Sequence, residues 1–171
     1  MKKQVTVMIA IMFILTFTAA LYAATQPPQV GGTLPDMKLQ KLDDSKAQVL
    51  IIQIFSMYCP YCQKDAPNMN RFFGLIENNP KFKGKIKILG IGAGNTQFEV
   101  DTFKKKYKVQ FPLIPDADFT IHKIVGEVRT PYFIVVKLNG PKKMEVIYSK
   151  LGGHENVEAF LAEIVQLSGI K

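Results

Sequence analysis

The feature that most constrains this chain is a short apolar run, Val49–Ser56 (VLIIQIFS), which two cysteines follow almost at once. The run is nearly continuous and rich in β-branched residues, a pattern typical of a strand that is buried on both faces. Apolar residues make up 47% of the chain and charged residues 21%, which excludes a disordered chain, a collagen-like fibre and a disulfide-dense mini-protein. A length of 171 residues fits one domain.

Strands and helices alternate along the chain. Strands are predicted at Val49–Ser56, Ile86–Ile91, Phe111–Ile114, Tyr132–Leu138 and Glu145–Ser149. Helices are predicted at about Cys59–Asn78, kinked at Pro67, and at Gln97–Tyr107, Phe119–Val125 and Asn156–Leu167. A hairpin-type turn, Asn139-Gly140-Pro141, separates the last two strands. This order predicts an α/β domain with a mixed central sheet and helices on both faces.

The amino terminus has the three-part layout of a secretory signal: Lys2 and Lys3, an apolar core at Val5–Phe17, and a small, alanine-rich segment that ends near Ala23. We therefore expect a signal peptide at residues 1–23, a linker at 24–32 and the folded domain at 33–171. An uncleaved anchor is the alternative, because the uncharged stretch is long enough to span a bilayer. Either way, the domain would lie in the periplasm or at the outer face of the cytoplasmic membrane, where disulfides persist.

The charge pattern argues against a nucleic-acid partner. The chain has 22 basic and 14 acidic side chains and a formal net charge of +8. Its lysines are scattered, and no basic stripe interleaved with aromatic residues is present in the sequence. We interpret the lysines as solvated faces of the domain.

The two cysteines of the chain stand as Cys59-Pro60-Tyr61-Cys62, where a predicted strand gives way to a predicted helix. At this spacing the two sulfurs can meet across one helical turn and form a reversible disulfide. Cys59 would occupy the helix start, where unpaired N–H groups and the helix dipole favour a thiolate. Cys62 would be less exposed and suited to resolving a mixed disulfide, and Pro60 suits the first helical turn. Such chemistry needs no metal and no organic cofactor.

Other roles for the cysteines fit less well. A structural disulfide across two residues closes too short a loop to stabilise much. A zinc site needs about four ligands, and His122 and His154 could complete one only by long-range folding. We expect His122 to be a partly buried helical residue and His154 a residue of a loop or helix start.

With these motifs the sequence resembles the thioredoxin superfamily, and more closely its exported TlpA/ResA-like branch, from about Val30 to Ile170. The resemblance rests on an entry segment, the active-site strand with its cysteine pair and Pro67, a strand and turn that follow the branch's inserted helix, and a substrate-facing loop. These segments are Val30–Asp36, Phe55–Cys62, Phe111–Asp116 and Arg129–Phe133. The resemblance implies a thioredoxin-like fold with an N-terminal hairpin extension and an inserted helix.

The resemblance also implies roles for individual residues. The Thr130–Pro131 bond would be cis, and the backbone of Thr130 would pair with a substrate segment. Pro60 and Tyr61, between the cysteines, would contact the substrate as well. The implied activity is that of an exported thiol–disulfide oxidoreductase, usually a reductase, for example in cytochrome c maturation. Protein thiols or disulfides would be its substrates, a membrane-embedded thiol reductase its electron donor, and the chain would act as a monomer without a cofactor.

The chain departs from the family at three places. Tyr58 stands where the family usually has Trp. The Pro-Tyr dipeptide between the cysteines is more typical of glutaredoxins, so the redox potential of the TlpA/ResA-like branch cannot be assigned to this chain. Gln53 stands where thioredoxins have a buried Asp that assists proton transfer, and an amide cannot serve as that base.

Two other functions stay open from the residues alone. A thiol peroxidase of the peroxiredoxin type is suggested by Ser56, three residues before Cys59, although Ile52 stands where a proline is expected, four residues before Ser56. A Sco-like copper-binding chaperone would need three residues between its cysteines and a downstream histidine, and this chain has only two between them.

Overall fold

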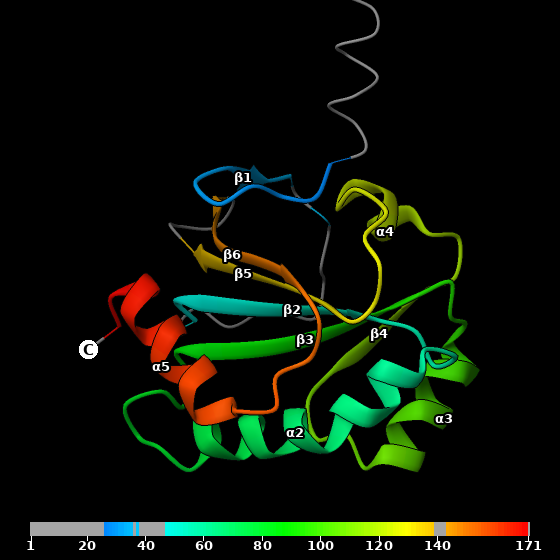
Figure 1. Ribbon diagram of the computed structural model, residues 1–171, viewed down its shortest axis with the longest axis horizontal. Coiled ribbons are helices and arrows are strands. Elements are labelled where there is room, and N and C mark those ends of the chain that lie inside the picture. The colour runs from blue at the N-terminus through cyan, green and yellow to red at the C-terminus, as the bar shows by residue number, and fades with distance from the viewer. Residues whose placement is uncertain (1–25, 36, 38–46, 139–142, 171) are drawn as a thin grey trace, which may run out of the picture.

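The computed structural model describes residues 26–35, 37, 47–138 and 143–170. In chain order the elements are β1 (Thr33–Leu34), β2 (Val49–Phe55), α2 (Pro60–Glu77), β3 (Ile86–Ala93), α3 (Gln97–Tyr107), β4 (Leu113–Asp116), α4 (Thr120–Ile124), β5 (Tyr132–Leu138), β6 (Met144–Leu151) and α5 (Val157–Ser168) (Figure 1). The predicted α/β architecture is confirmed. The predicted signal segment, at residues 1–23, lies outside the described residues.

The six strands form one mixed sheet in the order β1-β6-β5-β2-β3-β4. Strands β2, β3 and β4 run parallel to one another, whereas β5 is antiparallel to its two neighbours, β2 and β6. All seven residues of β2 are buried, because β2 has a strand on each side and packed side chains on both faces. This burial is the reason that its sequence is an almost unbroken apolar run.

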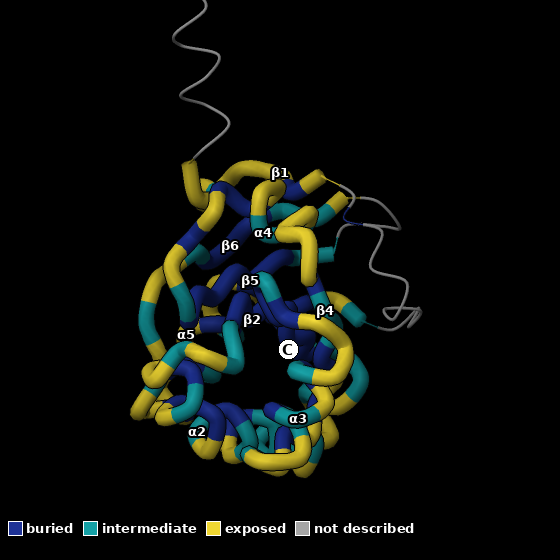
Figure 2. Tube along the Cα trace, turned by 90° about the vertical axis from the view of Figure 1, so that its right-hand side faces the viewer, coloured by how far each residue is buried: buried dark blue, intermediate teal, exposed yellow. Residues whose placement is uncertain are grey.

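Alternate side chains of β2 point to opposite faces and belong to two apolar clusters. On one face, α2, α3 and α5 supply Met69, Phe103 and Phe160 to a cluster that includes Ile51. On the other face, Ile52 belongs to a cluster that the α4 region and the β1 edge cover (Figure 1). Buried residues accordingly run along the central strands, and exposed residues lie on the outer turns (Figure 2).

The predicted strand at Phe111–Ile114 is placed two residues too early, since β4 begins at Leu113. Phe111 is buried, with its ring centroid 6.1 Å from that of Phe73, so its apolar character reflects packing rather than strand pairing. Gly90 donates a hydrogen bond to the carbonyl of Pro112 (2.9 Å), and the paired residues follow from Leu113 onward.

Two predicted features are only partly visible. The pairing of β5 with β6 agrees with a hairpin, but the turn predicted at residues 139–141 lies outside the described residues. Strand β1 extends the sheet edge at β6, whereas most of the segment that would complete an N-terminal hairpin, residues 36–46, is also outside them. None of the helices in the described ranges is long and apolar enough to cross a membrane.

Candidate active site

Cys59 lies in the short turn that joins β2 to α2. It is the N-cap of α2, with extended backbone angles (φ −81°, ψ 114°), and its Sγ accepts a hydrogen bond from the backbone N–H of Cys62 at 3.4 Å. Pro60 occupies the first turn, where its missing N–H costs nothing. The strand-to-helix junction therefore aims an unpaired helix N-terminus at the Cys59 sulfur, as the sequence predicts.

A second loop reaches the same sulfur from the start of β5. The Thr130–Pro131 bond is cis, in agreement with the family resemblance. The thiol of Cys59 lies 3.3 Å from the carbonyl oxygen of Thr130 and donates a hydrogen bond to it. Residues 71 positions apart in the chain thus meet at one site. Of the other predicted contact residues, Pro60 and Tyr61 are both exposed beside the sulfur.

The two thiols differ in acidity. Partial burial raises the pKa of Cys59, but interactions with the side chains of Thr130 and Cys62 and with the backbone N–H groups of Tyr61 and Cys62 outweigh burial and hold the pKa of Cys59 below its ordinary value. Burial, reinforced by the hydrogen bond with Cys59, raises the pKa of Cys62 to about 12. The lowered pKa of Cys59 favours a thiolate at that residue, whereas burial disfavours a thiolate at Cys62.

This difference predicts selective alkylation of the reduced protein. With a pKa of about 12 for Cys62, only about one molecule in 10⁵ carries that thiolate at pH 7. We expect iodoacetamide at pH 6 to 7 to modify Cys59 at least about 10³-fold faster than Cys62. Peptide mapping by mass spectrometry after timed quenching measures both rates. Equal labelling of the two thiols would contradict the assignment of the nucleophile.

Asn95, which the sequence interpretation did not single out, fixes the backbone of this turn. Asn95 is fully buried, and its Oδ1 accepts a hydrogen bond from the backbone N–H of Met57 at 2.8 Å. On the other side, Nε2 of Gln63 donates to the carbonyl of Met57 at 2.7 Å. The peptide groups two residues before Cys59 are thereby fixed from two elements. The available sequence signal was a polar run, Asn95-Thr96-Gln97, directly after the glycine-rich segment Gly90–Gly94.

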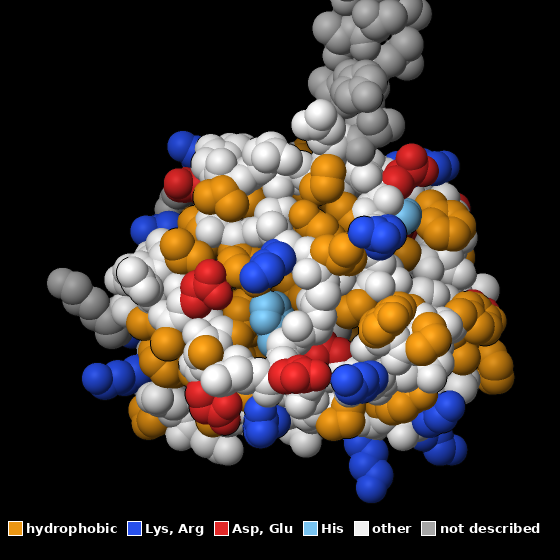
Figure 3. All heavy atoms as spheres, viewed as in Figure 1, with side chains coloured by type: hydrophobic (Ala, Val, Ile, Leu, Met, Phe, Trp, Pro, Cys, Tyr) orange, Lys and Arg blue, Asp and Glu red, His pale blue; other side chains and the backbone are white. Residues whose placement is uncertain are grey.

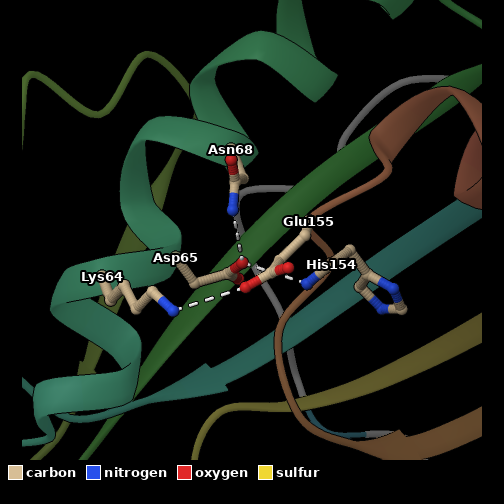
Figure 4. A network of polar contacts seen from close by, with 5 residues as sticks. All are labelled: Lys64, Asp65, Asn68, His154 and Glu155. Atoms are coloured by element: carbon tan, nitrogen blue, oxygen red, sulfur yellow. Dashed lines mark hydrogen bonds and ion pairs between the residues drawn. The ribbon is translucent and has the colours of Figure 1, made fainter.

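A buried carboxylate lies on α2 one turn beyond Cys62. Asp65 is 4% exposed, and its Oδ1 accepts a hydrogen bond from the backbone N–H of His154 at 3.0 Å and one from Asn68 at 3.5 Å (Figure 4). Burial raises the pKa of Asp65. Gly153 must be glycine here, because a Cβ at that position would lie 2.5 Å from Oδ1 of Asp65.

His154 lies in the loop before α5, as predicted, and is half-buried. Its ring stacks on Phe160 with centroids 3.5 Å apart, and burial lowers the pKa of His154 to about 4, so the imidazole is neutral at pH 7. His122, predicted to be partly buried and helical, lies on α4 with its Nε2 2.8 Å from the carbonyl of Val128. Within the described ranges, no three His, Cys, Asp or Glu side chains are grouped so that they could hold a metal ion.

Gln53 occupies the β2 position where the resemblance would place a buried acid. It is 5% exposed and is paired in the sheet with Gly90 and Phe133. Among the described residues, the buried carboxylates are Asp65 of α2 and Asp116 of β4, and β2 has none. The sequence interpretation noted the loss of the acid at Gln53 but did not single out Asp65.

The fold and the site define the class: a thioredoxin-like domain with a reactive cysteine pair at the N-terminus of a helix. The chain belongs to the AhpC/TSA family, whose model matches residues 26–147.

Among known proteins, it is similar to the thiol-disulfide oxidoreductase ResA of Bacillus cereus, with 24% identity over 157 residues, which cover 87% of this chain and 86% of that protein. The structure is similar to the thioredoxin domain of a thiol-disulfide oxidoreductase from Bacteroides vulgatus, with a TM-score of 0.57, 16% identity and coverage of 80% and 96%. StoA from Bacillus subtilis also has a TM-score of 0.57, with 20% identity and coverage of 80% and 98%. The predicted class, a protein thiol–disulfide oxidoreductase, is confirmed, and neither the peroxidase nor the copper chaperone is favoured.

Proposed function

We propose that the chain is an exported reductase of protein disulfides, in which Cys59 attacks and Cys62 resolves. The observation that carries the proposal is the asymmetry of the pair: Cys59 has a lowered pKa, and Cys62 has a pKa of about 12 beside it. Thr130 and Pro131, together with Pro60 and Tyr61, are the proposed substrate contacts. The Thr130 carbonyl lies against the Cys59 sulfur, Pro131 forms the cis bond with Thr130, and Pro60 and Tyr61 are exposed next to Cys59 in the chain.

The reaction takes place in two exchanges. In the first, the Cys59 thiolate bonds to one sulfur of the substrate disulfide, and the other substrate sulfur leaves and takes up a proton. In the second, Cys62 loses its proton and attacks Sγ of Cys59, which releases the remaining substrate sulfur as a thiol. The substrate gains two electrons, and the enzyme is left with a Cys59–Cys62 disulfide.

The raised pKa of the Cys62 thiol supports the reductive direction. Strongly oxidising proteins of this kind owe their potential to a stabilised reduced form, in which a thiolate is favoured. Burial opposes a thiolate at Cys62, so the reduced pair lacks that stabilisation at one of its two sulfurs. Each reaction oxidises the two thiols of the protein to a disulfide, so a reductant must restore them. A membrane-embedded thiol reductase is the proposed electron donor. The signal-like residues 1–23 support an extracytoplasmic setting, such as one where c-type cytochromes mature.

The reduction potential of the Cys59–Cys62 couple tests the direction. We expect equilibration of the purified domain with dithiothreitol buffers to give a value near the thioredoxin end, about −270 mV, and reduction of insulin disulfides when a reductant is supplied. A potential near −120 mV would instead make the protein an oxidant. Rapid consumption of hydrogen peroxide by the reduced protein would favour the peroxidase.

A further inference from the structure

Three large aromatic side chains are exposed around the start of α2 and α3. They are Tyr58, Tyr61 and Phe98, with exposed fractions of 67%, 73% and 80%. Phe98 is the most exposed large hydrophobic side chain of the described residues. Figure 3 shows hydrophobic side chains gathered on the right of this face, where Figure 1 places the start of both helices. Several exposed aromatic residues together, beside a reactive thiol, indicate a binding surface.

A hydrogen bond joins the two segments that carry these residues. The phenol of Tyr58, the residue before Cys59, donates a hydrogen bond to the carboxylate of Glu99 on α3. Glu99 is itself fixed, because it accepts from the backbone N–H of Thr96 at 2.7 Å in the capping box of α3. Phe98 precedes Glu99 in the same first turn. Tyr58 is therefore bonded to the residue that follows Phe98, at a helix start that its own capping box fixes.

The site carries charge of both signs, with the Glu99 carboxylate bonded to Tyr58 and an arginine next to Thr130. Arg129 immediately precedes Thr130, whose carbonyl contacts Cys59. Arg129 is exposed, and no acidic side chain within the described ranges forms an ion pair with it. The whole chain has a formal net charge of +8. A segment that binds along Thr130 passes this guanidinium, so a carboxylate on that segment would be favoured.

We propose that Tyr58, Tyr61 and Phe98, termed the aromatic rim, select substrates in which an apolar side chain flanks the reactive cysteine of an acidic segment. The apolar side chain packs on the rim while the segment runs along Thr130, and Arg129 pairs with a nearby carboxylate. This inference rests on the proposed function, because it concerns the same thiol. It adds the chemical class of the substrate segment, which neither the cysteine pair nor the fold determines.

The test uses peptides in which a single cysteine is joined to 2-thiopyridine, so that release of the chromophore reports attack by Cys59. One peptide has Phe beside its cysteine and Glu two positions away; the second has Ser in place of Phe, and the third has Lys in place of Glu. Each rate is divided by the rate with hydroxyethyl disulfide, which is too small to span the rim. We expect the wild-type protein to prefer the Phe peptide to the Ser peptide about tenfold.

Phe98→Ser should reduce this preference to about twofold or less, whereas Leu167→Ser should retain it. Leu167 is a matched control, since it is a 45% exposed hydrophobic residue on α5. Arg129→Ser should remove most of the preference for Glu over Lys, and added salt should do the same to the wild-type protein. The substituted side chains are all exposed, so we expect the variants to fold.

Unchanged preference in Phe98→Ser would overturn the proposal. So would a dimer in sedimentation that this substitution dissociates, because the rim would then be a contact between copies of the chain. If the wild-type protein attacked none of the peptides and did not reduce hydroxyethyl disulfide, the proposed function itself would fail. That outcome is distinguishable from the loss of selectivity alone.

Discussion

Cys59→Ser is expected to abolish the reduction of insulin disulfides, with a loss of at least about 10³-fold. The only other thiol of the chain, Cys62, is 1% exposed and has a pKa of about 12. It is therefore both inaccessible to a protein disulfide and almost fully protonated at neutral pH. The turbidity of reduced insulin, followed with dithiothreitol as the reductant, measures the effect.

The substitution suits this purpose because it leaves the helix start intact. Cys59 is the N-cap of α2, and serine is one of the preferred N-cap residues, whose hydroxyl can accept the Cys62 N–H that Sγ now accepts. We expect the thermal midpoint of unfolding to change little. An active and stably folded variant would show that Cys62 is the nucleophile, which would reverse the roles of the two residues.

The fold could be predicted because its strands have strong and simple patterns. Val49–Phe55 is buried on both faces and is therefore apolar at every position but one. Where local sequence and tertiary packing disagree, prediction was less accurate. Phe111 is an aromatic residue of the kind that is common in strands, but it packs in the apolar core before β4 begins.

The candidate site was predictable where it is local and was missed where it depends on distant segments. The positions of Cys59 and Cys62 follow from their spacing at a strand-to-helix junction. The packing of Asp65 against Gly153 and His154 joins α2 to a segment almost ninety residues later, and no spacing rule indicates such a pair. Asn95 reaches Met57 in the same way, across 38 positions. Buried polar residues of this kind become visible only when the fold brings their partners together.

Cys62→Ala is expected to stop the reaction at the mixed disulfide. The first exchange needs only Cys59, whereas release of the substrate needs a second thiolate, and the chain has no third cysteine. Loss of the Cys62 side chain removes one of the hydrogen bonds that lower the pKa of Cys59, but the bonds with Thr130 and the backbone stay. We therefore expect Cys59 to react somewhat more slowly and to remain covalently joined to its partner.

The trapped species can be detected even when the substrate is unidentified. The variant, expressed with its own N-terminal segment, should give adducts on non-reducing electrophoresis that collapse with dithiothreitol and are absent from the Cys59→Ser, Cys62→Ala double variant. The buried sulfur of Cys62 packs in the main apolar cluster, so alanine leaves a small cavity and lowers the free energy of unfolding by about 1 kcal/mol, which a folded domain can bear.

Other outcomes would indicate a different chemistry. If Cys59 accumulated as a sulfenic or sulfinic acid with no protein adduct, oxidation by peroxide would be its chemistry. Stoichiometric copper binding without adducts would contradict disulfide exchange and favour a chaperone. Adducts with acidic proteins whose trapped cysteine has an apolar neighbour would support both disulfide exchange at Cys59 and selection by the aromatic rim.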